Sequence, residues 1–407
     1  MVKSTETHSK RYIGENSMYV DIIKKELNNL GTPAYIFDLD KLKTRVLNIK
    51  KILGSKANIC YAMKANPFII RPMDKYIDKY EVCSPGEYEI CHRHNIAPEK
   101  IVVSGVNKTY ESMDRILELS KGLGIFTIES EKHYEILSKL CKEKQLIINV
   151  LIRLSSGNQF GVDKENFERL ANLVAEDSNL VLYGIHYYSG TQKKMKKIVK
   201  EIEMLCEYRQ YLKDNYNIEL HELEYGPGLI FNYFESDTGY GFEEQLTELK
   251  EVLNSACQYE EITLEMGRFI ASECGSYCTS VVDIKKNEDY NYCIVDGGIH
   301  QLNYYGQTMG MKKPYMDIIS DSKDLTKWNV CGSLCTVNDV ILRDAMLPEL
   351  TVGDILVFKN CGAYSVTEGM ALFLSRELPK VMFYDKENGF RIVRRQIGTD
   401  FINEEEC

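Results

Sequence analysis

Short apolar runs alternate with longer amphipathic stretches from residue 58 to residue 265. Each run is short and apolar enough for a β-strand that is buried on both faces, as the strands of parallel sheets are. The stretches between the runs can each hold a helix, so the pattern predicts eight strand–helix units and a (β/α)8 barrel. The runs are Asn58–Met63, Tyr80–Cys83, Ile101–Ser104, Ile125–Ile128, Ile148–Leu154, Val181–Tyr188, Glu222–Tyr225 and Ile262–Glu265.

Two helices are predicted from more specific signals. One covers Val20–Leu30 and is ended by Gly31 and Pro33. Another begins near Met195, where apolar residues recur at helical spacing opposite a face rich in lysine. We interpret this face as the solvated side of a surface helix, with a binding patch as the alternative. Its lysines are Lys193, Lys194, Lys196, Lys197 and Lys200.

The pattern changes after Arg268. Strand-like runs become alternating and closely spaced, and turn signals such as Asp296-Gly297-Gly298 separate them. We therefore expect a second, mostly β domain. Its predicted strands are Ser276–Ile284, Tyr292–Asp296, Asp339–Leu342, Ile355–Phe358, Val381–Tyr384 and Arg391–Gln396.

The composition narrows the class of protein. The chain has 407 residues, of which 44% are hydrophobic, so about two domains with sizeable cores are expected. A formal net charge of −10 argues against a nucleic-acid partner. Because no run of about 18 apolar residues occurs, we expect no membrane span. The polar segment Met1–Ser17 lacks the apolar core of a signal peptide.

Cysteine is frequent but is not arranged as a metal site. The 13 cysteines form no CxxC pair, and no histidine lies near the closest pairs, Cys274 with Cys278 and Cys331 with Cys335. We therefore predict no metal site. Free thiols scattered through a chain of this length are typical of a reducing compartment, so we expect a cytoplasmic protein.

The functional groups of such barrels lie where the strands end. The first predicted strand ends at Lys64. Inside a low-dielectric cavity, desolvation favours the neutral amine of a lysine, and a neutral amine can form a Schiff base. The alternative is a lysine that emerges into solvent, and the position of Lys64 alone does not decide between the two.

Polar and flexible residues also follow the last two barrel strands. Gly226, Gly228 and Gly267 lie at positions where backbone N–H groups often hold a phosphate, so together they indicate a phosphorylated ligand. Glu265, at the end of the eighth strand, is suited to pair with a protonated heterocyclic nitrogen. A salt bridge to a neighbouring arginine is the alternative for this carboxylate.

Seven motifs in order carry a resemblance to a known family. They are Tyr61-Ala62-Met63-Lys64-Ala65-Asn66, the segment from Glu81 to Glu87, the segment from Gly184 to Gln192, Gly226-Pro227-Gly228, Glu265-Met266-Gly267-Arg268, the segment from Cys331 to Cys335, and Gly362-Ala363-Tyr364. The set resembles the diaminopimelate/ornithine decarboxylase family, which comprises pyridoxal-phosphate enzymes of the alanine-racemase-like fold (fold type III). The resemblance implies a cofactor-binding barrel over residues 36–268 and a β domain made of residues 18–35 and 269–407.

The resemblance assigns roles by position. Lys64 would hold pyridoxal 5'-phosphate through a Schiff base, and Glu265 would keep the pyridine nitrogen protonated. Cys335 would protonate the substrate carbon in the active site of the partner subunit, which implies a homodimer with shared active sites. The other residues placed around the cofactor are Glu81, Tyr188, Thr191, Gly226, Gly228, Gly267, Arg268 and Tyr364.

Three positions depart from the family pattern. Tyr188 stands where the family usually stacks a histidine on the cofactor ring, and we interpret the nearby His186 as a hydrogen-bonded polar group inside the barrel. Met266 replaces a common proline, which changes rigidity and not chemistry. Thr336 stands where an acidic residue usually holds the substrate's distal amino group, and a hydroxyl cannot hold an ammonium ion as a carboxylate does.

These departures resemble a branch that decarboxylates an aminoacyl group tethered to a carrier protein, as in butirosin biosynthesis. Lys312 and Lys313 are similar to that branch and would contact an acidic carrier protein or a substrate carboxylate, with an ordinary exposed pair as the alternative. The sequence thus predicts α-decarboxylation of an L-amino acid, either free or on an acyl carrier protein. A decarboxylase of free diaminopimelate or another amino acid, a non-catalytic regulatory relative and a racemase remain as alternatives.

Overall fold

The computed structural model describes residues 17–239, 241–256 and 259–405 of the chain. They form two compact units. One unit consists of residues 43–231 and 239–270 and is called the barrel unit below. The other consists of the described residues up to 42, residues 232–238 and the described residues from 271 onward, and is called the β unit.

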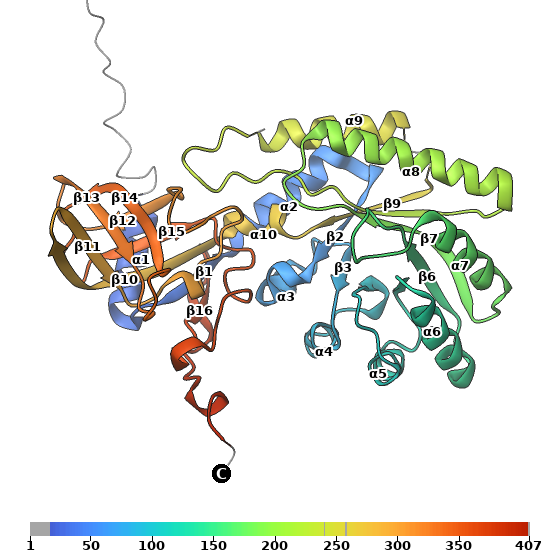
Figure 1. Ribbon diagram of the computed structural model, residues 1–407, viewed down its shortest axis with the longest axis horizontal. Coiled ribbons are helices and arrows are strands. Elements are labelled where there is room, and N and C mark those ends of the chain that lie inside the picture. Colours follow the sequence, from blue (N-terminus) through green and yellow to red (C-terminus); the bar gives the residue numbers. More distant parts are fainter. Residues whose placement is uncertain (1–16, 240, 257–258, 406–407) are drawn as a thin grey trace, which may run out of the picture. The chain divides into compact units, whose positions relative to one another are not determined.

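The barrel unit is built on a closed barrel of eight parallel strands that follow one another in chain order (Figure 1). The last strand pairs with the first, with Cys60 opposite Glu265. The predicted eight runs overlap these strands, so the predicted (β/α)8 barrel is confirmed. The strands are β2 (Asn58–Ala62), β3 (Lys79–Val82), β4 (Ile101–Val103), β5 (Ile125–Ile128), β6 (Ile148–Arg153), β7 (Leu180–Tyr188), β8 (Glu222–Gly226) and β9 (Glu261–Met266).

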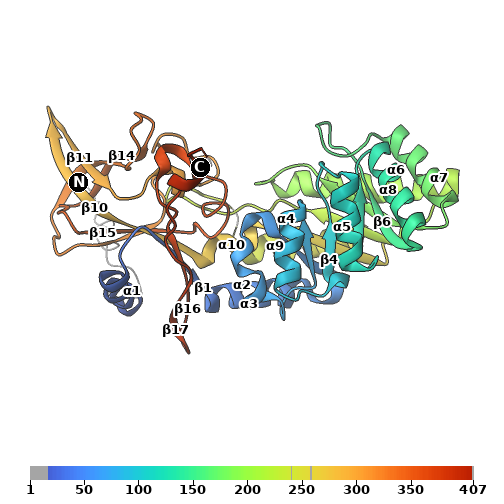
Figure 2. The same cartoon turned by 90° about the horizontal axis from the view of Figure 1, so that it is seen from below.

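Helices surround these strands, as Figures 1 and 2 show. Several begin at a residue whose side chain accepts a hydrogen bond from the backbone N–H three residues later, which satisfies a donor that the helix leaves free. These capping residues are Ser84, Thr109, Ser130 and Asp163. The helices are α2 (Leu39–Leu53), α3 (Ile70–Met73), α4 (Pro85–Arg93), α5 (Tyr110–Ser120), α6 (Glu131–Lys144), α7 (Lys164–Glu176), α8 (Met195–Tyr216), α9 (Phe242–Ala256) and α10 (Arg268–Ala271).

The β unit contains a nine-stranded, mostly antiparallel sheet in which β15 and β12 branch from the main path. The predicted mostly β domain is therefore confirmed. The pattern did not predict β12 and β13, because β12 has only four residues and most positions of both strands are exposed or only partly buried. The strands are β1 (Ala34–Asp38), β10 (Gly275–Asn287), β11 (Tyr290–Val295), β12 (Met316–Ile319), β13 (Leu325–Cys331), β14 (Val340–Pro348), β15 (Ile355–Lys359), β16 (Lys380–Asp385) and β17 (Gly389–Arg394).

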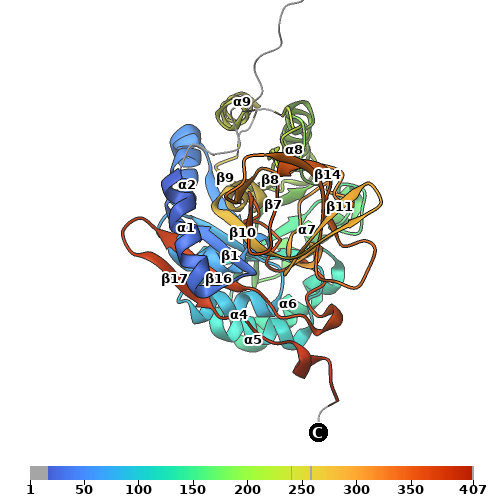
Figure 3. The ribbon, with the colours of Figure 1, turned by 90° about the vertical axis from the view of Figure 1, so that its left-hand side faces the viewer.

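The helix that precedes β1 belongs to the core of the β unit. This helix, α1 (Ser17–Leu30), lies beside β1 and β16 in Figure 3. Its residues Ile23 and Leu27 are buried against Ala34, Ile36 and Met382 of the sheet. The helix ends as predicted, with Gly31 in the left-handed region at φ 74° and its N–H bonded to the carbonyl of Leu27.

Candidate active site

The amino-terminal end of the barrel is filled by ion pairs. The Nζ of Lys79 lies 2.5 Å from a carboxylate oxygen of Glu222 and 2.9 Å from one of Glu261. The hydroxyl of Thr263 donates a second hydrogen bond to Glu222. These side chains form a lower layer inside the barrel, so a ligand has to enter from the carboxyl ends of the strands.

Lys64 lies at the carboxyl end of β2 and faces a carboxylate. Its Nζ is 2.6 Å from Oε2 of Glu81 and 3.5 Å from Sγ of Cys83. Burial lowers the pKa of Lys64, but Glu81, Cys83 and Glu265 raise it by more, so the pKa lies above the ordinary value of a lysine. The sequence left open a desolvated neutral amine and a lysine near solvent. The side chain is 40% exposed and Glu81 from the next strand stabilises its ammonium form, so the protein without its ligand favours the charged amine.

A buried lysine, Lys108, follows β4. The Nζ of Lys108 donates to the carbonyl of Gly105 at 2.6 Å and to Oγ1 of Thr127 at 3.3 Å. Burial lowers the pKa of Lys108 to about 8. The desolvation argument that the sequence suggested for Lys64 thus describes Lys108 better, and sequence reasoning missed Lys108 because it lies in a loop rather than at the end of a predicted strand.

Glu265 is paired with a histidine inside the barrel. The Nε2 of His186 lies 3.3 Å from Oε2 of Glu265. Burial raises the pKa of Glu265, but His186, Glu224 and Lys64 lower it by more, so the carboxyl is held ionised well below its usual range. The interpretation of His186 as a hydrogen-bonded group holds for Nε2, whereas its Nδ1 is buried without a partner among the described residues.

Tyr188 lies across the end of β8 and among the charged residues of the site. A Cβ atom built on Gly226 would come within 2.4 Å of Cδ2 of Tyr188, so only glycine leaves room for this ring. Burial raises the pKa of Tyr188, and its charged neighbours include Lys64, Glu265 and Arg268. The structure thus brings these predicted site residues together around one end of the barrel.

Glycines bring the backbone segments of the site close together. Gly228 has φ 57°, and a Cβ atom there would lie 2.2 Å from the carbonyl oxygen of Gly190. This contact packs the turn after β8 against the segment that carries Thr191. On Gly267 a Cβ atom would lie 2.9 Å from that of Ala65, which follows Lys64. Backbone without side chains at successive strand ends is an arrangement that can hold a phosphate group.

Lys193 connects two of these segments. Its Nζ lies 2.7 Å from Oε2 of Glu201 and 2.9 Å from the carbonyl oxygen of Gly226, and its N–H donates to the carbonyl of Gly228 at 2.8 Å. The Tyr225 hydroxyl donates to the same carboxylate at 2.7 Å. Lys193 therefore fixes the loop after β7 to the turn after β8.

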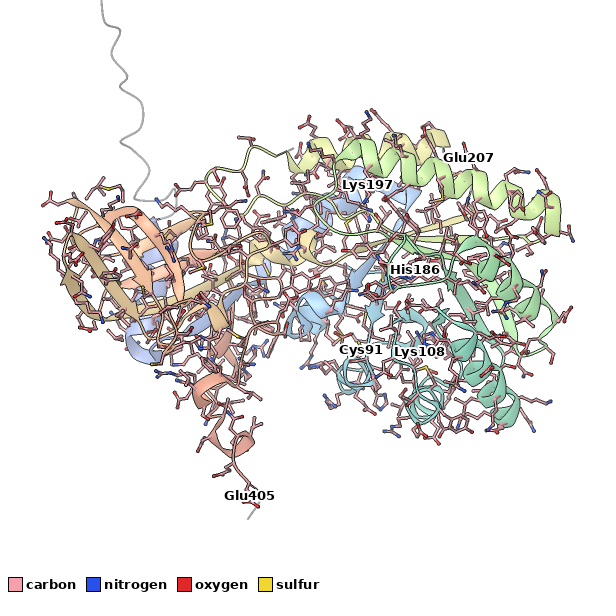
Figure 4. The ribbon with its side chains drawn as sticks, in the orientation of Figure 1. Cys91, Lys108, His186, Lys197, Glu207 and Glu405 are labelled. Carbon is pink, nitrogen blue, oxygen red and sulfur yellow. The ribbon has the colours of Figure 1, made fainter. Side chains whose placement is uncertain are left out.

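The interpretation of the lysine-rich face is wrong for Lys193, which precedes α8 and is only 5% exposed. The other four lysines of that face are exposed, and Figure 4 shows Lys197 on α8 and His186 within the barrel. The sequence contained a signal that Lys193 is buried. Glu201 stands on the otherwise apolar side of the helix, where a buried carboxylate needs a cation.

The β unit holds the remaining predicted residues, Cys335, Thr336 and Tyr364. Cys335 is exposed in the loop between β13 and β14. The carboxylate of Asp339 shapes this loop, because it accepts hydrogen bonds from the N–H of Leu334 at 2.7 Å and from that of Ile299 at 2.9 Å.

Tyr364 has an unusual backbone conformation. Its φ is 69°, in the left-handed region that side chains other than glycine, asparagine and aspartate rarely adopt. Its carbonyl accepts hydrogen bonds from the N–H groups of Thr367 and Glu368, which stabilise the turn. Residues held in this way are concentrated at functional sites.

The residues at the barrel end fit pyridoxal 5'-phosphate. Lys64 supplies an amine, Glu265 supplies a carboxylate whose Oε1 is buried without a hydrogen-bond partner among the described residues, and Gly228 and Gly267 supply partly buried backbone without side chains. Within the described ranges, no three histidine, cysteine or carboxylate side chains are grouped as metal ligands. In the same ranges, no helix is long and apolar enough to cross a membrane.

Comparison with known families gives a match over more than half of the chain. Residues 39–272 match the family model described as pyridoxal-dependent decarboxylase, pyridoxal binding domain. The matched segment contains all eight barrel strands together with Lys64, Tyr188 and Glu265.

Curated relatives and solved structures extend over both units. The chain is 23% identical over 403 residues to L-glutamyl-[BtrI acyl-carrier protein] decarboxylase of Niallia circulans, covering 91% of this chain and 92% of that protein. It is 26% identical over 366 residues to diaminopimelate decarboxylase of Helicobacter pylori, covering 82% and 85%. The crystal structure of diaminopimelate decarboxylase from Helicobacter pylori complexed with L-lysine superposes with a TM-score of 0.82 at 22% identity, covering 93% and 98% of the two chains, which shows a shared fold.

Proposed function

The chain belongs to the family of pyridoxal-dependent decarboxylases, and from this premise we propose that its substrate is an aminoacyl group attached to a larger carrier. The protein is an enzyme that uses pyridoxal 5'-phosphate to decarboxylate an amino acid. The observation that carries the assignment of the site is the position of Lys64 among Glu81, Cys83 and Glu265 at the open end of the barrel.

Each residue at the carboxyl end of the barrel strands has a different proposed role in the reaction. When bound, the cofactor accepts the electron pair that the departing carboxylate leaves behind. Lys64 would hold the cofactor covalently, and Glu81 would accept the proton that the Lys64 ammonium group must lose first. Glu265, kept ionised by His186, would hold a proton on the pyridine nitrogen. Tyr188, whose ring lies beside Gly226, would cover the cofactor ring.

Thr336 and the relatives support a carrier-bound or otherwise extended substrate. A threonine has no negative charge to pair with a distal ammonium ion, which a free diamine substrate would present. The relative from Niallia circulans acts, by its name, on a glutamyl group on an acyl carrier protein. In a relative from Staphylococcus aureus, 25% identical over 379 residues, the named substrate is an alaninyl group joined through a carbamoyl link to a hydroxybutanedioate.

Lys312 and Lys313 lie in a segment that resembles the carrier-linked branch, and we propose that one of them contacts a partner. Lys313 is paired with Glu235 at 3.2 Å, so the interpretation of an ordinary exposed pair does not describe it. Lys312 is exposed, and its Nζ lies 4.9 Å from the centre of the Phe234 ring. We assign the contact with an acidic carrier or a substrate carboxylate to Lys312.

A second copy of the chain is the expected partner of the β unit. Its segments 370–374 and 401–402 expose apolar side chains beside each other, because Asn403 donates hydrogen bonds to the carbonyl of Leu372 and to the hydroxyl of Ser375. An exposed apolar patch of this kind marks an interface. A homodimer in which Cys335 completes the partner's active site would bury it. The patch consists of Met370, Leu372, Phe373, Leu374, Phe401 and Ile402.

We also expect the enzyme to act in a reducing compartment such as the cytoplasm. No disulfide links the described cysteines to one another, and most of them are buried. An oxidising compartment would favour pairing of exposed thiols such as Cys335, whose proposed role requires a free thiol.

The decisive experiment measures carbon dioxide release by the cofactor-loaded enzyme. The panel contains free lysine, ornithine, glutamate and meso-diaminopimelate beside glutamyl and related thioesters on a carrier protein. Release from a thioester alone is the expected result. Release from free diaminopimelate at full rate would instead establish the second candidate, which the similarity to the Helicobacter pylori enzyme favours.

A further inference from the structure

A carboxyl group with no described role lies directly beside the proposed pyridine site. Glu224 is in the middle of β8 and is 0% exposed. Across the sheet it is paired with His186 on β7 and with Thr263 on β9, two residues before Glu265. Neither of its buried carboxylate oxygens accepts a hydrogen bond from a donor among the described residues, and the charged group that acts on it most strongly is Glu265.

Among the described residues, the cation that acts on Glu224 is Lys79, and it is already paired with other carboxylates. The charged and titratable groups that face it are Glu265 on β9, Glu222 on β8, Lys79 on β3, His186 on β7 and Cys60 on β2. Lys79 is already paired with Glu222 and Glu261. The Nε2 of His186 is directed to Glu265.

A carboxyl group in such a place does not stay ionised. Isolated buried charges are so costly that the group takes up a proton instead. When two carboxyl groups share one site, one of them holds the proton and the other keeps the charge. Burial and then Glu265 raise the pKa of Glu224 well above its ordinary value, whereas the pKa of Glu265 is lowered. Because of these different surroundings, Glu224 is expected to be protonated and Glu265 to be ionised.

We propose that Glu224 is a neutral carboxylic acid that acts as a positioning residue for Glu265, donating its O–H to the carboxylate that faces the cofactor nitrogen. The proposal rests on the role of Glu265 given above. Its consequence is that the pyridine nitrogen faces one negative charge instead of two. The negative charge of Glu265 would be stabilised by hydrogen bonds from His186 and from Glu224.

Infrared spectroscopy of the purified holoenzyme tests the protonation state directly. A buried carboxylic acid has a C=O stretching band that an ionised carboxylate lacks. We expect this band in the wild type at neutral pH and its loss in Glu224→Gln. The matched control is Glu207→Gln, which changes an exposed glutamate on α8 and should leave the band in place. If the difference spectrum between wild type and Glu224→Gln holds no such band, Glu224 is ionised and the proposal fails.

Cofactor affinity tests the positioning role. Glu224→Gln keeps an uncharged donor, so it should bind pyridoxal 5'-phosphate as the wild type does and keep the pH dependence of the cofactor's absorption. Glu224→Leu removes the donor to a charged group and should weaken binding about tenfold. Should the leucine variant not fold, Glu224→Met is used in its place. Unchanged affinity in the variant without a donor would overturn the positioning role.

Failure of the proposed cofactor site and failure of the proposed protonation state give different experimental results. Loss of the proposed cofactor site would appear as an absorption band that survives Lys64→Ala, whereas the infrared band of Glu224 does not depend on which lysine holds the cofactor. A protonated Glu224 in an enzyme whose cofactor is held elsewhere would therefore contradict the proposed site and leave the protonation state standing.

Discussion

The Nε2 of His186 lies 3.3 Å from Oε2 of Glu265, and both side chains are almost entirely shielded from solvent. An ionised carboxylate in such a position depends on its partner. Since His186 is the strongest of the groups that lower the pKa of Glu265, its removal should allow that pKa to rise.

We therefore expect His186→Leu to bind pyridoxal 5'-phosphate at least tenfold more weakly, and to shift the pH dependence of the cofactor's absorption. Equilibrium dialysis and a spectroscopic pH titration measure the two effects. The control is His221→Leu, since His221 and Glu260 form a similar pair at 3.1 Å that is exposed. Equal behaviour of the two variants would show that Glu265 does not need its buried partner.

Lys64→Ala should abolish the absorption band of the lysine-bound cofactor, because no other amine is expected to reach the same aldehyde. Lys108→Ala is the informative control, since Lys108 is buried and has the lower pKa of the two. It should retain the band if the protein folds. If the band persists in Lys64→Ala and is lost in Lys108→Ala, the lysine that binds the cofactor is Lys108.

Cys335→Ala should remove nearly all normal turnover while cofactor binding survives. Mixing this variant with Lys64→Ala should restore about a quarter of the wild-type sites if subunits exchange at random and sites are shared. The control is Cys331→Ala, four residues earlier in the same segment. No recovery of activity, despite exchange shown by tagged subunits, would argue against shared active sites.

Lys193→Met should weaken the binding of inorganic phosphate and of the cofactor. The substitution leaves Glu201 as a buried charge without its main partner, which costs about 3 kcal/mol of stability. The loop after β7 then loses its attachment to Gly226. Lys193→Arg should recover part of the affinity, and Lys196→Met, on the exposed face, should change neither property.

The pH dependence of stability provides an independent check on Glu224. Its folded-state pKa is raised above the unfolded value, so the folded state holds a proton that the unfolded state releases as the pH rises above about 4.5. Stability should therefore fall as the pH increases from that value toward the folded-state pKa. Glu224→Gln carries no such proton, so its free energy of unfolding should exceed that of the wild type at neutral pH and lose this advantage near pH 4. Chemical denaturation at several pH values measures the difference.

The sequence predicted the barrel because each strand is a local apolar run, and such runs do not depend on distant residues. The charge states at the site do depend on them. Whether Lys64 is neutral is decided by Glu81 on the next strand, and whether Lys193 is buried is decided by Glu201 on the following helix. Neither relation appears in the spacing of apolar residues.

The candidate site was only partly visible for the same reason. Glu265 and the glycines stand at strand ends, where sequence reasoning searches for function. Glu224 lies inside a strand, and its meaning comes from the two neighbouring strands that the closed barrel brings beside it. A run in which carboxylates alternate with apolar residues, as Glu222 and Glu224 do, is the signal that would have revealed it.

Lys79, Glu222 and Glu261 form an ion-paired layer inside the barrel, at the amino-terminal ends of its strands. We expect protons that travel between Glu224 and bulk water to pass through the opposite end, where the cofactor site lies. A bound cofactor would block this path for protons. Exchange of the Glu224 proton for deuterium should therefore slow when the cofactor site is filled. The deuterium content of the Glu224 carboxyl group would then measure how long the cofactor has stayed bound.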